Sequence, residues 1–294
     1  MDYYTEIKNE LIENEITKKA KDYSKNKSDL MHYYNVGKLL TDAGKHYGEG
    51  ILREYSNKLT RDLNSKYDIS TLNRMRKFYG LIEKMATMSP NLSYSHYVEL
   101  LPFDNINKIQ YYIRITEEQK LSVRTLRIKI KSNEFERLPD ETKNKLINKQ
   151  KTDVTDLIKN PLIIKNNLNI EVISEKYLKK IILEDVESFM KELGNGYSFI
   201  GSEYKIKIGN SYNYIDLLLF NYKYNCFVVI ELKITELKKE HIGQIEIYMN
   251  YIDKHVKEIH HDKTIGIIIC KHYNKLIMEY CSDSRIISRE FKLV

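Results

Sequence analysis

Two apolar stretches in the C-terminal half of the chain, YNYIDLLLF (residues 212–220) and CFVVIELKI (226–234), carry charged residues within strand-like runs. Asp216 precedes four apolar residues in the first stretch, and Glu231 and Lys233 follow four apolar residues in the second. Runs of this kind predict β-strands that are buried on both faces. A carboxylate inside such a strand is costly unless it is paired, hydrogen-bonded or bound to a metal.

The spacing of these charged residues predicts a functional centre. Glu231 and Lys233 are two positions apart, so their side chains point to the same face, about 6.6 Å apart along the strand. If the strand of Asp216 pairs beside that of Glu231, two acids and one lysine converge on one spot. That combination is the chemistry of a divalent-metal site with a cationic helper.

The surrounding pattern predicts a mixed sheet flanked by helices. A helical period runs over residues 174–194, and strand-like stretches follow at 197–209, 212–220 and 226–234. A helix containing HIGQIEIYMNYIDKHV, the apolar strand TIGIIIC and a final strand-like stretch up to Val294 complete the order αβββαβ. The fold class that we expect is therefore α+β.

The N-terminal half has apolar residues at helical spacing. Two amphipathic helices are expected between residues 3 and 43, a third over 51–67 and a fourth over 71–85, with Ser70 as the N-cap of the fourth. Further helical segments lie near residues 93–101 and 117–138. A helix, a tight turn at 68–70 and a basic helix form the outline of a helix-turn-helix, in which the second helix enters the major groove of DNA.

Basic side chains in this half are candidate nucleic-acid contacts. In the helix-turn-helix interpretation, Arg74, Arg76 and Lys77 face phosphates or base edges, and Asn73 is a possible reader of adenine. Arg124 and Arg127 belong to a second basic cluster. The alternative is that both groups are solvated helix faces.

Residues 139–169 are polar, rich in lysine and asparagine, and contain two of the four prolines. This composition predicts a domain boundary. We therefore expect a helical DNA- or partner-binding domain over 1–138, a linker over 139–169 and a catalytic domain over 170–294.

Composition adds little to this assignment. The count of 48 Lys and Arg against 41 Asp and Glu leaves +7, which agrees with a polyanionic partner without requiring one. The three cysteines lack CxxC spacing, which indicates a reduced, cytoplasmic protein without a zinc site. Neither a signal peptide nor an apolar run of about 18 residues is apparent, so no membrane association is expected.

The motif D-x14-E-x-K across Asp216, Glu231 and Lys233, followed by Gln244 on a helix, resembles the PD-(D/E)XK nuclease superfamily. The chain is most similar to its YhcG-type subfamily, which joins an N-terminal helical domain of unknown function to a C-terminal nuclease domain. FMKELGNGYSFIGSE, YIDLLLFNYKYNCFVVIELKI and TIGIIICK carry the C-terminal resemblance, over about residues 183–294. LSYSHYVELL and LSVRTLRIKI carry a looser one over about residues 30–138.

Two positions depart from the family pattern. Ile215 replaces the proline of the motif's name, a common variation that leaves the chemistry intact. Ser202 and Glu203 stand where the family usually has a basic residue and a glutamine. Either a substrate contact is missing there, or Glu203 is an additional acid near the metal.

The resemblance implies a metal-dependent phosphodiesterase centre. Asp216 and Glu231 would hold one or two Mg²⁺ or Mn²⁺ ions, with the carbonyl of Leu232 as a further ligand. Lys233 would orient or deprotonate the attacking water, and Gln244 would position water or the scissile phosphate. Tyr248 is a possible contact to the nucleic-acid backbone, with a place in the core as the alternative.

An upstream acid is expected to complete the metal site. Glu192 lies near the end of the helix before the first strand, where relatives carry an acid, and Asp185 on the same helix is its rival. The function expected is a Mg²⁺-dependent DNA endonuclease, in defence against foreign DNA or in DNA processing. The alternatives are a non-catalytic DNA-binding or complex-forming subunit and an RNase, and cleavage of both strands of a duplex would call for a homodimer.

Overall fold

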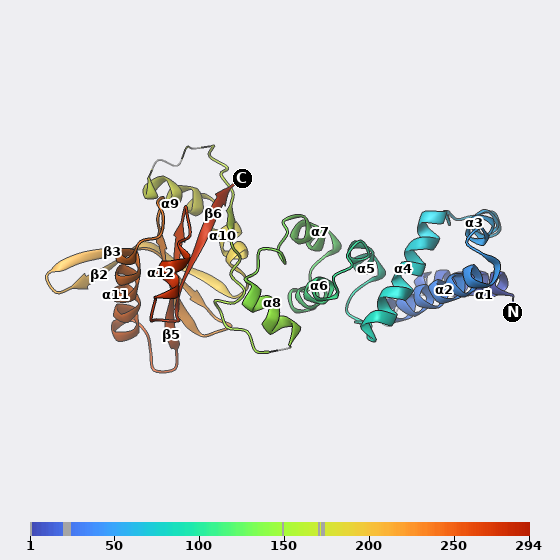
Figure 1. Cartoon of the computed structure of the whole chain (residues 1–294), viewed down its shortest axis with the longest axis horizontal. Helices are drawn as coiled ribbons and strands as arrows, with labels where there is room; N and C mark the ends of the chain where they lie inside the picture. Colours follow the sequence, from blue (N-terminus) through green and yellow to red (C-terminus); the bar gives the residue numbers. More distant parts are fainter. Residues whose placement is uncertain (1, 20–24, 149, 170, 172–173) are drawn as a thin grey trace. The chain divides into compact units, whose positions relative to one another are not determined.

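The computed structural model describes residues 2–19, 25–148, 150–169, 171 and 174–294. The chain forms two compact units, Met1–Phe135 and Glu136–Val294 (Figure 1). The described part of the first unit is helical, as predicted. Its helices are α1 (Tyr3–Lys19), α2 (Lys25–Tyr47), α3 (Ile51–Asp62), α4 (Ile69–Met85), α5 (Tyr94–Leu100), α6 (Ile106–Gln119) and α7 (Val123–Lys131).

Helices α1 to α4 share one apolar core, which includes Ile7, Leu40 and Leu72. The predicted N-cap of α4 is wrong by two residues. Asp68 has an extended backbone, and its carboxylate accepts a hydrogen bond from the amide of Thr71 at 2.7 Å. Ser70 already lies inside the helix, where its side chain cannot cap the first turn. α3 ends at Asp62, so residues 63–68 connect the two helices in place of the tight turn expected at 68–70. Docking of α4 to DNA remains a prediction.

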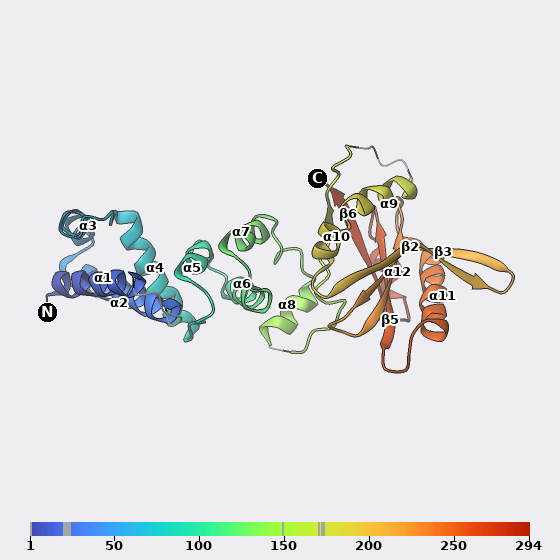
Figure 2. The same ribbon diagram turned by 180° about the vertical axis from the view of Figure 1, so that it is seen from behind.

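The second unit is built on a six-stranded sheet in the order β1-β6-β5-β4-β3-β2 (Figure 2). The pairs β2–β3 and β3–β4 are antiparallel. The pairs β4–β5, β5–β6 and β6–β1 are parallel. The strands are β1 (Leu162–Ile164), β2 (Tyr197–Ile208), β3 (Ser211–Asn221), β4 (Cys226–Leu232), β5 (Asp262–Cys270) and β6 (Ile286–Leu293). The helices are α8 (Asp140–Ile147), α9 (Glu175–Glu184), α10 (Val186–Leu193), α11 (Lys239–His255) and α12 (Lys275–Glu279).

The predicted αβββαβ order is confirmed. α9 and α10 share one apolar cluster with alternate residues of β4, such as Val228 and Ile230, and α11 shares a second cluster with Val229. Every residue of β4 is buried, as its continuous apolar run predicts. The helix expected over 174–194 is interrupted at Asp185, which has a non-helical backbone and caps α10 through the amide of Ser188 at 3.0 Å.

The linker expected over 139–169 differs from the structure. These residues belong to the second unit and contain α8 and β1. β1 extends the sheet by pairing with β6, and Val154 and Ile158 lie in the same buried cluster as Leu162. Sparse apolar residues in a polar segment have too weak a period to reveal this packing.

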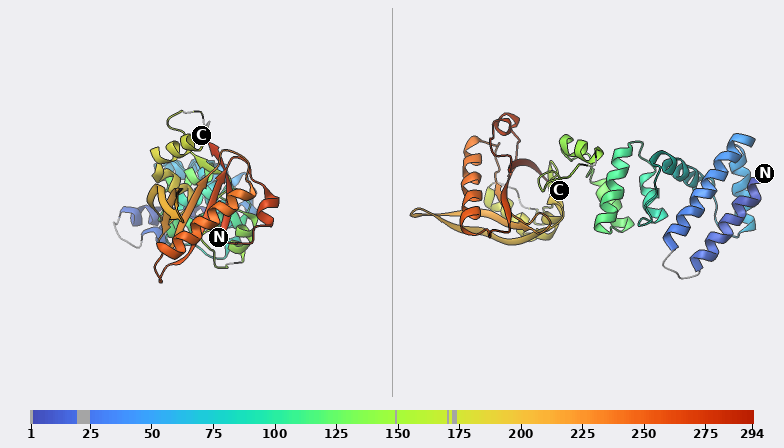
Figure 3. Two further views of the ribbon diagram at one scale, coloured as in Figure 1. Left: turned by 90° about the vertical axis from the view of Figure 1, so that its left-hand side faces the viewer. Right: turned by 90° about the horizontal axis from the view of Figure 1, so that it is seen from below.

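β2 and β3 form a hairpin that extends beyond the rest of the sheet (Figure 3). Their register runs without a shift from Ser202↔Leu217 to Ile208↔Ser211. Among the described strands, the pairing of β4 with β3 spans only Leu217 to Asn221. The outer part, residues 203–216, is therefore a two-stranded ribbon.

Within the described ranges, no helix combines the length and apolar character needed to cross a bilayer.

Candidate active site

Asp216, Glu231 and Lys233 meet where β3 and β4 pair, as their sequence positions predict. Oδ2 of Asp216 accepts a hydrogen bond from the amide of Leu232 at 3.0 Å, which fixes the carboxylate against the neighbouring strand. Nζ of Lys233 lies 3.5 Å from Oε2 of Glu231. Two acids and a lysine are thus held by adjacent strands of one sheet.

Glu231 is the most deeply buried of these three residues, with 2% of its surface exposed. Burial raises the pKa of its carboxyl group to about 8, and the negative charge of Asp216 adds to this effect, while Lys233 opposes it. Oε1 of Glu231 is buried and accepts no hydrogen bond from the described residues. A buried carboxylate oxygen without a partner is costly, so it is available to an incoming cation.

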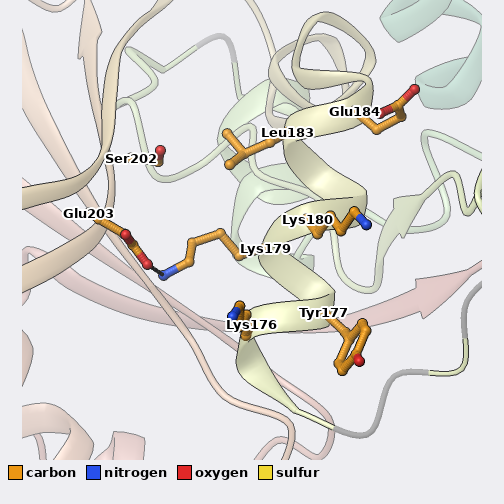
Figure 4. Close-up of a pocket in the computed structure, with 8 residues that line it drawn as sticks. All are labelled: Lys176, Tyr177, Lys179, Lys180, Leu183, Glu184, Ser202 and Glu203. Carbon is orange, nitrogen blue, oxygen red and sulfur yellow. Dashed lines mark ion pairs between the residues drawn. The ribbon is translucent and has the colours of Figure 1, made fainter.

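A second lysine contacts the site from α9. Nζ of Lys179 lies 2.9 Å from Oδ1 of Asp216. It also lies 3.0 Å from Oε1 of Glu203, the pair that Figure 4 shows. Burial alone would lower the pKa of Lys179, but the two carboxylates outweigh it and raise that pKa above its usual value. Glu203 has a left-handed backbone with φ 50°. Lys179 therefore joins Asp216 to the acid that departs from the family pattern.

A fourth acid approaches from the start of α9. Oε2 of Glu175 lies 3.6 Å from Nζ of Lys233, which thus pairs with both Glu175 and Glu231. His241, in the first turn of α11, has a pKa lowered by burial and by the positive charge of Lys233. The site thus links its acids in pairs through two lysines: Lys179 joins Asp216 to Glu203, and Lys233 joins Glu231 to Glu175.

A pocket of about 560 Å³ lies between α9 and β2, beside Lys179. Figure 4 shows Lys176, Lys179 and Lys180 projecting from the helix, with Ser202 and Glu203 on the strand. Lys176 and Lys180 are exposed. Three lysines and two glutamates, Glu184 and Glu203, line this pocket, and this small positive excess favours an anionic ligand there.

Gln244 and Tyr248 lie one turn apart on α11. Nε2 of Gln244 donates a hydrogen bond to the hydroxyl of Tyr248 at 3.1 Å. Tyr248 is 5% exposed and belongs to the apolar cluster under α11. The prediction that Tyr248 contacts nucleic acid is therefore wrong, because its ring packs in the core, the alternative left open by the sequence. Gln244 remains partly accessible.

Glu192 does not join the acids of β3 and β4. Its carboxylate accepts a hydrogen bond from the amide of Ile163 at 2.9 Å and forms ion pairs with Arg137 and with Lys159, the latter at 3.4 Å. These contacts fix α10 to β1. The prediction of a metal ligand is corrected, because the carboxylate is neutralised by two cations of its own. Asp185, the rival, caps α10 and pairs with Lys165 at 3.6 Å.

The donor set at β3 and β4 fits a hard divalent cation. Among the described residues, no group of three or more His, Cys, Asp and Glu side chains is arranged to hold a metal ion. Mg²⁺ is commonly bound by one or two carboxylates and keeps several waters, so Asp216, Glu231 and the carbonyl of Leu232 suffice in kind. Oε1 of Glu231, for which the described residues supply no hydrogen-bond donor, supports this fit. A metal ion would compete with Lys179 for Asp216.

The basic residues predicted in the first unit lie on α4 and α7. Arg76 forms two hydrogen bonds to Glu49, at 2.6 and 2.9 Å, and Arg127 forms two to Glu99, at 3.0 and 2.5 Å. Their guanidinium groups are therefore occupied within the protein. Arg74, Lys77 and Arg124 are exposed. Asn73, Arg76 and Lys77 line one pocket of about 320 Å³.

Sequence reasoning missed Glu175 and Lys179. They stand four positions apart on α9, where a charged pair normally marks a solvated helix face. Nothing in their local pattern reveals that this face reaches Asp216 and Lys233. The apolar residues Leu178, Ile181 and Ile182 bring α9 onto the sheet and so place both side chains at the site.

Comparison with known families agrees with this architecture. Residues 155–290 match the family model of the YhcG PDDEXK nuclease domain, and residues 7–137 match that of the DUF1016 N-terminal domain. The C-terminal part of the chain therefore belongs to the YhcG-type PDDEXK nuclease domains, and the N-terminal part is a DUF1016 N-terminal domain.

A curated relative has the same family name. "Putative nuclease YhcG" of Escherichia coli is 25% identical over 194 residues, which cover 64% of this chain and 52% of the relative. The chain thus spans about half the length of that relative. Among solved structures, a repair endonuclease from Pyrococcus abyssi matches 43% of this chain and 49% of its own, with a TM-score of 0.29 and 17% identity. EndoMS in complex with double-stranded DNA matches 43% and 47%, with a TM-score of 0.29 and 20% identity.

Proposed function

We propose that the chain hydrolyses phosphodiester bonds of DNA with Mg²⁺ or Mn²⁺ as the cofactor. The observation that carries this proposal is the meeting of Asp216, Glu231 and Lys233 on paired strands, with one buried oxygen of Glu231 that accepts no hydrogen bond from the part of the chain that the structure describes. A purely structural cluster would gain stability from apolar residues at these positions.

Each side chain has a distinct role in this proposal. Asp216 and Glu231 would hold the cation, which when bound would stabilise negative charge on the phosphate and acidify a water. Lys233 orients that water and neutralises phosphate charge, and Glu175 helps to hold its ammonium group in place. Gln244 positions the scissile phosphate. The side-chain amide of Gln244 is oriented by the hydrogen bond that it donates to the hydroxyl of Tyr248.

The substrate and the biological setting are part of the same proposal. Exposed Arg74, Lys77 and Arg124 of the first unit are available for phosphate contacts, and a net charge of +7 agrees with a polyanionic substrate. Cleavage of both strands of a duplex needs two active sites, so we propose a homodimer for that reaction. Defence against foreign DNA or DNA processing is the setting that such an activity serves.

Purified protein incubated with supercoiled plasmid and Mg²⁺ tests the proposal. We expect nicking or linearisation that EDTA abolishes and that Lys233→Ala reduces by about 10²-fold or more, because general acid–base assistance contributes about 10²–10⁴. Lys223→Ala, an exposed lysine at the β3–β4 turn, should retain full activity. Cleavage of RNA alone would reassign the substrate. If the wild type shows no metal-dependent nicking above that of Lys233→Ala, the proposal is wrong and the chain is a non-catalytic subunit on a nuclease-like scaffold.

A further inference from the structure

The outer part of the β2–β3 ribbon has two different faces. Tyr212 pairs with Lys207 across the hairpin, and Tyr214 pairs with Lys205. Residues directly opposite one another in an antiparallel pair project from the same face, so two tyrosines and two lysines share one side. Ile206 and Ile215 alternate with them, and both are fully buried in the cluster that includes α11.

The tyrosine and lysine face is open to solvent. Tyr212 is 56% exposed and Tyr214 is 53% exposed. Nζ of Lys205 lies 3.8 Å from the centre of the Tyr212 ring, a cation–π contact that restrains the ring on the surface of the ribbon. Large exposed rings on a ribbon of residues 203–216 have no role in the core of this sheet.

This face leads to the active site. Along β3, Ile215 packs in the cluster that includes α11, so its neighbour Tyr214, and Tyr212 two residues before it, project from the opposite side. Asp216 lies on that opposite side as well, because it pairs with Lys179 of α9. Two flat aromatic side chains and two cations therefore lie in line with the carboxylate assigned to the metal. Figure 3 shows the hairpin reaching outward beyond α11, so its tip is accessible.

We propose that this face, which we call the ribbon track, binds a DNA strand with unpaired bases and leads it to Asp216. The inference rests on the proposed nuclease function and specifies its substrate. Bases stack on Tyr212 and Tyr214, and Lys205 and Lys207 contact the phosphates between them. Stacking on aromatic rings requires free base faces, which a duplex keeps inside its own stack.

The composition of the ribbon track favours a nucleic acid over a second copy of the chain. Lysines on an edge strand hinder pairing with another strand, because two such ribbons would bring like charges together. The same charges complement a phosphate backbone. The positive charge of the ribbon track and its position next to Asp216 thus both favour a nucleic-acid strand as its ligand.

The binding test uses the full chain with Lys233→Ala, in EDTA, so that no cleavage occurs. Fluorescence anisotropy with a labelled single-stranded DNA of about 16 nucleotides measures the affinity. We expect Tyr212→Ala with Tyr214→Ala to weaken binding by about tenfold or more, because each stack that is removed costs about 1–3 kcal/mol and 1.4 kcal/mol is tenfold. Tyr222→Ala with Tyr280→Ala removes tyrosines that are 64% and 85% exposed elsewhere in the unit and should leave the affinity unchanged.

The lysines have a separate signature. Lys205→Gln with Lys207→Gln should reduce the slope of log affinity against log salt by about 0.7 for each phosphate that the protein no longer neutralises. Lys275→Gln on α12 is the matched control, because it removes a lysine charge from an exposed position outside the ribbon. Thermal melting confirms that each variant is folded.

Three results would overturn the inference: no change of affinity in the double tyrosine variant, equal binding of the matching duplex, or a tyrosine-dependent preference for single-stranded RNA. Failure of the proposed function is distinguishable, because it appears as absent plasmid cleavage by the wild type. A protein that cleaves DNA normally after both tyrosines are removed, and binds the single strand as before, contradicts only the ribbon track.

Discussion

Glu231 combines a catalytic type of side chain with an environment that resists its charge. Its carboxyl group lies in a fully buried strand, and its Oε1 accepts no hydrogen bond from the described residues. The pKa of this group rises to about 8, whereas it would be about 4.3 in an unfolded chain. The folded protein therefore holds a proton at neutral pH that the unfolded chain releases.

The sign of the resulting pH dependence follows directly. The stability contributed by protonated Glu231 is fully present below about pH 4.3 and is lost as the pH rises toward about 8. In EDTA, we expect the free energy of unfolding of the wild type to fall relative to Glu231→Gln across this window. The relative change should be on the order of a few kcal/mol, since each pKa unit corresponds to about 1.4 kcal/mol.

Urea unfolding of both proteins between about pH 5 and pH 8.5 measures this difference. Glutamine keeps the shape of the protonated acid and does not titrate, so effects of other ionisable groups cancel in the comparison. Parallel stability curves for the two proteins would contradict the raised pKa.

Single residues also show what the sequence could reveal. Asp216, Glu231 and Lys233 were identifiable because charges inside apolar strands are costly and demand a reason. Lys179 carries no such signal, because a lysine on a helix surface is ordinary. Its role depends on the packing of α9 against the sheet, which no local pattern encodes.

At the scale of elements, α10 is anchored to the edge of the sheet by one carboxylate. Glu192 joins the amide of Ile163 in β1 to Arg137 and to Lys159, whose side chain is 3% exposed. Removing one partner from a buried ion pair costs about 3–5 kcal/mol. We therefore expect Glu192→Ala to lower the free energy of unfolding by roughly that amount.

Urea denaturation measures this decrease, and Glu187→Ala is the control. Glu187 forms an exposed i,i+4 pair with Lys191 on the same helix, so its removal should change stability by about 0.5 kcal/mol or less. Titration calorimetry with Mn²⁺ should give equal affinities for folded Glu192→Ala and the wild type. A variant that keeps its stability and loses metal affinity would restore Glu192 as a ligand.

Long periodic elements were predictable, and interruptions were not. The strands at 212–220 and 226–234 and the helix of Gln244 follow from clear apolar patterns. The break at Asp185 falls within an unbroken helical period, where backbone geometry decides the outcome. β1 has three residues, too few to show any period.

At the scale of the molecule, the boundary between the two units falls at residues 135 and 136. We propose residues 136–294 as the independently folding unit and expect 170–294 to be insufficient. The shorter fragment lacks Val154, Ile158, Leu162 and Ile164, which are buried in its core. Each buried apolar side chain contributes about 1.5–3 kcal/mol, so together they approach the whole stability of a typical domain, about 5–15 kcal/mol.

Circular dichroism during urea unfolding compares the two fragments. The longer fragment should unfold in one cooperative transition, and the shorter one should lack a steep transition. Equal unfolding transitions of the two fragments would show that residues 139–169 are a linker, as the sequence predicted.

The two edges of the six-stranded sheet differ in how they meet other chains. One edge ends in β1, which has three residues and leaves few backbone groups for another strand. The other edge is β2, which is twelve residues long, carries a register shift between Phe199 and Gly201, and bears Lys205 and Lys207 toward its outer end. The short length of β1 disfavours aggregation at the first edge. The two lysines and the register shift of β2 disfavour it at the second edge. Neutralising the two lysines should therefore lower solubility, because the side chains that we propose to contact phosphate also keep two ribbons from joining.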